Sequence, residues 1–123
     1  MERVINVSGK DVKFKATAGT LARYRMYFKR DLLKDLMKLS KKLEKIKDSD
    51  EQFEMLDLEV FEYIAWTMAK TADNNIPALE NWLDDFDTFS IIQILPEIIQ
   101  LMTDNMSQES ESKKKLVETV VEN

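Results

Sequence analysis

Carboxylates are the side chains of this chain whose types and spacing come nearest to a reactive site. An acidic cluster that could bind a divalent cation consists of Glu80, Asp84, Asp85 and Asp87. It lacks the ligand spacing and the glycine of a calcium-binding loop. Glu59 and Glu62 are one helical turn apart and could form a general acid–base pair, but no nucleophile accompanies them. We therefore expect no catalytic residue and no metal site.

The sequence lacks two residue types that many catalytic and metal sites require, so fewer classes of function are possible. The chain has no cysteine and no histidine, so disulfides, thiolate chemistry, the usual zinc sites and nucleophiles that depend on a histidine base are excluded. Its two glycines are too few for a glycine-rich phosphate loop. The composition predicts a protein that is not an enzyme and holds no cofactor.

Length and hydrophobicity indicate one folded domain. The 123 residues are 44% hydrophobic, which suffices for a core. The first ten residues, MERVINVSGK, contain no apolar signal segment, and no run approaches the roughly 18 apolar residues that span a bilayer. We expect a cytoplasmic protein with no membrane partner.

The elements that must position any binding surface begin with a predicted β-hairpin and a long helix. Arg3–Val7 and Asp11–Lys15 alternate apolar and polar side chains around a Ser8-Gly9-Lys10 turn. The residues expected to face inward are Val4, Val12 and Phe14. Residues 17–46 predict one helix that begins near Ala18, with Thr17 as its N-cap. Its apolar stripe runs through Leu21, Tyr24, Phe28, Leu32, Leu36, Leu39, Leu43 and Ile46.

Three further helices are predicted after residues 48–50. The first covers Asp50–Ala72, with a capping box at Ser49 and Gln52. A short one runs from Pro77, at its first position, to Leu83, and the last covers Thr88–Thr103, where Pro96 either kinks or restarts it. The expected fold is mainly α with an N-terminal β-hairpin and about four helices, in a single domain of residues 1–105. Residues 106–123 are poor in apolar side chains at first and predict a disordered tail or linker.

Three segments together resemble a known family. They are TAGTLARYRMYFKRDLLKDL from Thr17, EVFEYIAWTMAKTA from Glu59, and IPALENWLDDFDTFSIIQILPEIIQLMTDN from Ile76. In order and spacing they resemble the tail assembly chaperones of long-tailed bacteriophages and prophages of Gram-positive hosts, up to Asn105. The resemblance implies a non-catalytic chaperone of the host cytoplasm, absent from the mature virion, that coats the tape measure protein and helps recruit tail tube subunits.

The resemblance also implies that the chain has a longer counterpart. In this family a programmed ribosomal frameshift near the end of the short reading frame often makes an extended product. The chain would then be the short product, and the major tail tube protein would be reached through the longer one. Lysine codons are A-rich, so we hypothesise a slip site at or near Lys113, Lys114 and Lys115.

Charge is divided unevenly along the chain. Residues 1–47 carry 14 Lys and Arg against 5 Asp and Glu, whereas residues 48–123 carry 4 against 18, giving net charges of +9 and −14. The basic helix can pack beside acidic helices of its own chain, and copies can form a homo-oligomer through heterologous contacts; the two explanations are compatible. The candidate partner-binding residues are Arg23, Arg25, Lys29, Arg30, Trp82, Asp84, Asp85 and Phe86. Trp82 is expected to be partly exposed, because acidic residues flank its short helix.

A function of a different class is also open. Ten basic residues in the long helix and just after it would favour phosphate contacts, so the alternative is a small nucleic-acid-binding protein that uses this helix. The overall net charge of −5 and the absence of a helix-turn-helix pattern make nucleic acid the less favoured partner. Measuring salt-sensitive binding to duplex DNA would separate the two classes.

Overall fold

The computed structural model describes residues 1–46 and 58–105. Its elements, in order, are β1 (Glu2–Val7), β2 (Lys10–Lys15), α1 (Ala18–Phe28), α2 (Leu32–Ile46), α3 (Leu58–Ala72), α4 (Leu79–Leu83) and α5 (Thr88–Gln93). A further helix covers residues 95–105. The predicted class, mainly helical with an N-terminal hairpin, is confirmed. The predictions for the Ser49 and Gln52 capping box, the tail of residues 106–123 and the slip site at Lys113–Lys115 lie outside the described residues.

The hairpin covers one end of the domain with its apolar face turned inward. A two-residue turn at Ser8 and Gly9, with φ angles of 54° and 82°, joins the antiparallel strands, as a type I′ turn requires. The buried residues of the strands are Ile5, Val7 and Phe14, and Val12 is half-buried. The predicted inward position of Val4 is wrong, because this residue is 53% exposed. Val4 pairs with Lys13, so both face away from Phe14, since neighbours along a strand point to opposite faces.

The single helix predicted over residues 17–46 is also wrong, because the chain bends sharply between α1 and α2. Lys29 adopts a left-handed conformation with φ 57°, and its N–H donates to the carbonyl of Arg25 at 2.9 Å. Asp31 then caps α2, since its Oδ1 accepts the backbone N–H of Lys34 at 3.1 Å. We call Lys29–Asp31 the elbow.

The elbow keeps the apolar stripe inside the domain. A straight helix over residues 18–46 would be about 44 Å long, whereas a domain of about 100 residues has a radius of gyration of about 13 Å. The far half of a straight helix would therefore leave the core. With the elbow in place, the stripe residues Tyr24, Leu32, Leu36 and Leu39 are all buried.

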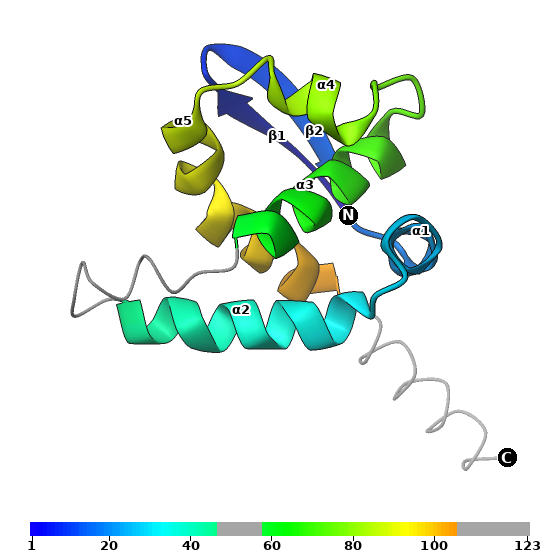
Figure 1. Ribbon diagram of the computed structural model, residues 1–123, viewed down its shortest axis with the longest axis vertical. Coiled ribbons are helices and arrows are strands. Elements are labelled where there is room, and N and C mark those ends of the chain that lie inside the picture. The colour runs from blue at the N-terminus through cyan, green and yellow to red at the C-terminus, as the bar shows by residue number, and fades with distance from the viewer. Residues whose placement is uncertain (47–57, 106–123) are drawn as a thin grey trace, which may run out of the picture.

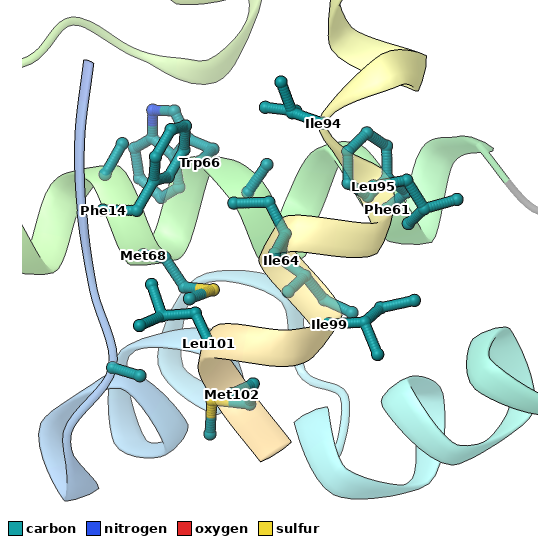
Figure 2. Packing of buried hydrophobic residues seen from close by; sticks show 14 of the residues in the cluster. Phe14, Phe61, Ile64, Trp66, Met68, Ile94, Leu95, Ile99, Leu101 and Met102 are labelled. Carbon is teal, nitrogen blue, oxygen red and sulfur yellow. The ribbon is translucent and has the colours of Figure 1, made fainter. Parts of the chain in front are cut away.

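Helix α3 is the centre of the core. It lies between the hairpin with α4 on one side and α2 on the other (Figure 1). Its buried residues come from every side of the helix: Val60, Phe61, Ile64, Ala65, Trp66, Thr67, Met68 and Ala69. Figure 2 shows Leu101 and Ile99 of the 95–105 helix beside Met68 and Ile64, within the same hydrophobic cluster.

The last part of the described chain contains two short helices, α4 and α5, and the longer 95–105 helix. Helix α4 has Ala78 as its N-cap, so Pro77 lies just before the helix rather than at its first position as predicted. Helix α5 ends at Gln93, and a turn at Ile94 separates it from the 95–105 helix. Pro96 therefore lies in the first turn of a restarted helix, where its missing N–H costs no hydrogen bond.

Candidate partner-binding surfaces

Three side chains hold the two helices at the elbow. Asp35 is 6% exposed and accepts the Tyr24 hydroxyl at 2.6 Å. Arg30 donates to both oxygens of the same carboxylate, from Nε at 2.7 Å and from Nη2 at 3.0 Å. Bidentate pairs of this kind are strong and directional. Because Tyr24 belongs to α1 and Asp35 to α2, the network ties the two helices together.

Burial and charge set the protonation of this network. Burial raises the pKa of Tyr24 well above its ordinary value, and the hydrogen bond to Asp35 raises it further. Burial also acts to raise the pKa of Asp35, but the hydrogen bonds from Arg30 and Tyr24 outweigh it, so that pKa is lowered. At neutral pH the network therefore holds an ionised Asp35 and a neutral Tyr24.

The bend creates a groove of about 910 Å³ that we call the elbow groove. Its lining residues come from α1, the elbow and the first turn of α2: Leu21, Ala22, Arg25, Met26, Lys29, Arg30, Asp31, Leu32 and Leu33. Met26 is 60% exposed, and Leu21 and Leu33 are half-buried, so apolar atoms face solvent along the groove. Arg25 and Lys29 are exposed at its rim, and within the described residues neither forms an ion pair. The groove is thus apolar inside and positively charged at its edge.

Three of the four predicted basic residues meet at this groove. Arg25, Lys29 and Arg30 line it, whereas Arg23 is half-buried on α1 with its guanidinium close to Gly19. The elbow also divides the basic row, because four exposed lysines continue along α2: Lys34, Lys38, Lys41 and Lys42. Among the described residues none of these four forms an ion pair. Ion pairing with acidic residues among the described residues therefore does not account for these four lysines.

Sequence reasoning missed Met26 and Leu33 of the groove and Asp35 of the network that holds the elbow. Met26 and Leu33 lie off the main apolar stripe, and Asp35 resembled one more polar residue of a solvated helix face. One signal was present: Asp31 is a favoured N-cap type in the middle of the predicted helix, and its side chain competes with helical hydrogen bonding.

The predicted partial exposure of Trp82 is wrong. Its side chain is 4% exposed and lies under the hairpin. The ring packs edge-on against Phe14, with centroids 6.4 Å apart, and against Phe86, with centroids 5.0 Å apart. The acidic residues around it point to solvent while the indole fills the inner side of the short helix. Trp82 is therefore a core residue and not a contact residue.

The acidic residues near α4 form an exposed patch that we call the acidic surface. Its members are Glu80, Asp84, Asp85 and Asp87, with the half-buried Phe86 among them. Lys10 approaches Asp85 at 3.9 Å, a distance at which an exposed pair contributes little. Across residues 1–46 and 58–105 no three acidic side chains are placed to hold a metal ion. The patch is thus a negatively charged surface with one apolar side chain.

The other candidate carboxylates, Glu59 and Glu62, lie on α3. Burial raises the pKa of Glu62, and the charge of Glu59 raises it further. The Tyr63 hydroxyl donates a hydrogen bond to Glu59. These contacts describe a carboxylate pair on a helix face and add no nucleophile to it.

In the described part of the chain, no helix is long and apolar enough to cross a membrane.

Comparison with known proteins adds no relative to this description. No family model, curated protein or solved structure matches the chain. The fold and its surfaces define a small helical domain that carries an apolar groove with a basic rim and a separate acidic surface. Any function has to be argued from these two surfaces and from the sequence resemblance.

Proposed function

We propose that the protein is a phage tail assembly chaperone that binds helical segments of the tape measure protein in its elbow groove. The observation that carries the proposal is the exposed apolar lining of that groove beside two cations, Arg25 and Lys29, that form no ion pair within residues 1–46 and 58–105. Amphipathic helices of an unassembled partner expose apolar stripes that aggregate unless covered. A groove between two helices is a common way to cover such a stripe.

The groove suits partner helices of varied sequence. An incoming apolar stripe would lie against Leu21, Met26 and Leu33, while Arg25 and Lys29 attract acidic residues on its flanks. Methionine adapts its shape to different side chains, which favours a coating role over recognition of one sequence. In the same proposal, an extended product of the gene links this domain to the recruitment of tail tube subunits.

We expect Met26→Glu to lower about tenfold the amount of tape measure protein that stays soluble and copurifies on co-expression, which corresponds to about 1.4 kcal/mol of binding free energy. The substitution places a charge where an apolar stripe would pack. Met37→Glu is the matched control, because Met37 is 57% exposed on α2 and Met26 is 60% exposed in the groove. Equal losses from both variants, or none from either, would contradict binding in the groove.

We also propose that copies associate head to tail. Figure 1 shows α4 and α2 at opposite ends of the domain with α3 between them, so the acidic surface of one copy can face the α2 lysines of the next. Such heterologous contacts close into rings or continue as filaments. Exposed ion pairs contribute only about 0–1 kcal/mol each, so the half-buried Phe86 has to add apolar contact.

Sedimentation over a concentration series should therefore show oligomers at low salt that become smaller at high salt. The double variant Asp84→Lys with Asp85→Lys should shift the distribution to monomer, because it sets like charges against α2. Glu2→Lys with Glu97→Lys makes the same charge change at exposed residues away from α4 and should leave the oligomers intact. A strict monomer at high concentration and low salt would overturn self-association, and an ineffective reversal would place the contact elsewhere.

A further inference from the structure

The elbow groove has a candidate occupant within the same chain. Residues 116–123, LVETVVEN, combine an apolar face with acidic side chains. At helical spacing the apolar face is Leu116, Val117, Val120 and Val121, and the acidic residues are Glu118 and Glu122. We propose that this segment docks in the elbow groove and blocks it against other helices. The docking stands independently, whereas its effect on tape measure binding rests on the proposed function.

The chemistry of the segment matches that of the groove. Its apolar side chains fit the lining of Leu21, Met26 and Leu33. Its two glutamates match Arg25 and Lys29 at the rim, two cations that form no ion pair with any other described residue. The segment contains no basic residue that these cations would repel. A volume of about 910 Å³ lies in the range of about 300–1,000 Å³ typical of ligand pockets.

Three other grooves suit the segment less well. The elbow groove has three cations, Arg25, Lys29 and Arg30, against Asp31. The groove between β1 and α5 has Arg3 against Glu97, and the one between β2 and α3 has Lys13 against Asp11 and Asp73, so neither carries a net positive charge that would attract glutamates. A third, beside Val60, has basic residues but a volume of only about 180 Å³. The comparison favours the elbow groove.

The length of chain between the last described residue and the segment allows the contact. Both figures show the end of the 95–105 helix beside the start of α2, which forms one wall of the groove. Residues 106–115 contribute ten residues, which span up to about 33 Å when extended. That reach is more than twice the radius of gyration of about 13 Å expected for a domain of this size, so the segment can reach a groove that begins beside the end of the 95–105 helix.

Tethering makes even a weak contact significant. A segment of eight residues does not hold a helix alone, so its affinity as a free peptide is expected to be low. A short flexible tether gives an effective concentration in the millimolar range. A contact with a Kd of about 1 mM between separate molecules would then be about half formed within one chain, and it would weaken a competing helix about twofold.

A spin label at the end of the full chain tests the docking directly. The sequence contains no cysteine, so Asn123→Cys provides a single attachment site. We expect the label to broaden the amide signals of Ala22, Met26 and Leu33 strongly, and to leave those of Val4 and Asp84 sharp. Uniform weak broadening, or broadening concentrated at another groove, would overturn the proposal.

Two double variants of the labelled chain supply the controls. Arg25→Glu with Lys29→Glu should reduce the broadening at the groove severalfold, because it repels the glutamates. Lys10→Glu with Lys13→Glu changes the charge equally at exposed positions of the hairpin, outside the groove, and should preserve it. Groove broadening that survives the first variant unchanged would contradict the charge match on which the docking rests.

The blocking effect has its own readout. Val117→Asp with Val120→Asp should abolish the broadening of amide signals at the groove, because the segment loses its apolar face. The amount of tape measure protein that copurifies should then rise about twofold, because the competing segment no longer occupies the groove. If the label reports docking but no tape measure protein binds to any variant, the proposed function fails and the docking stands. If tape measure protein binds and the label reports no docking, the further inference fails alone.

Discussion

Phe14→Ala should destabilise the domain by about 3–5 kcal/mol, as expected for removal of a fully buried aromatic side chain. Phe14 has no exposed surface and packs edge-on against Trp82, so it joins the hairpin to α4. Since domains of this size unfold with about 5–15 kcal/mol, the variant should remain folded only marginally. Urea unfolding followed by circular dichroism measures the loss as a lower midpoint.

Val4→Ala is the matched control for this prediction. Val4 belongs to the same hairpin but is 53% exposed on its outer face. Exposed substitutions of this kind change stability by less than about 0.5 kcal/mol. A similar loss from both variants would mean that hairpin formation as such, and not the contact of Phe14 with the core, limits stability.

Asp35→Asn should lower the free energy of unfolding at neutral pH by about 1.5–3 kcal/mol, the usual contribution of hydrogen bonds to a charged group. The amide cannot accept both donors of Arg30, and it is a weaker acceptor for the buried hydroxyl of Tyr24. The two helices should be held less firmly at the elbow, so we also expect faster amide hydrogen exchange in the first turn of α2. Urea titrations of both proteins give the difference in stability.

The pH dependence of that difference identifies its origin. The pKa of Asp35 is lowered on folding, so its contribution is fully present above the unfolded value of about 3.9. It is lost as the pH falls through the folded pKa. The gap between wild type and Asp35→Asn should therefore close below about pH 4. Asp84→Asn, at an exposed position, is the matched control and should change stability at neutral pH by less than about 0.5 kcal/mol. A gap for Asp35→Asn that stays constant with pH would contradict the charge-based explanation.

Local sequence patterns predicted the elements that depend on neighbouring residues alone. The hairpin followed from alternation around a Ser8-Gly9 turn, and the start of α1 followed from the N-cap Thr17. The elbow could not be found in this way, because the apolar stripe continues in helical register through Lys29–Asp31. The limited size of the core, which a straight helix would outrun, favours the bend, and the Asp31 cap and the Asp35 network hold it.

The surfaces were harder to predict than the elements. The burial of Trp82 depends on the hairpin lying across α4, a contact between segments far apart in sequence. The face of the hairpin on which Val4 lies depends on strand register, since a shift of one residue exchanges the two faces. Charge, in contrast, is visible in any sequence, and the basic and acidic residues chosen from it do lie on exposed surfaces, with Arg23 half-buried.

The short sequence separation within the elbow network bears on the order of folding. Arg30 and Asp35 are 5 residues apart and Tyr24 and Asp35 are 11 apart, whereas the contacts from Thr20 to Thr71 and from Ser8 to Asp87 span 51 and 79 residues. Closing a longer loop costs more chain entropy, so contacts between near neighbours can form first. The bend at residues 29–31 can thus form while the chain is still emerging from the ribosome, before the hairpin has α4 to rest upon. A nascent chain of this design would have the elbow groove in place before the rest of its domain was complete.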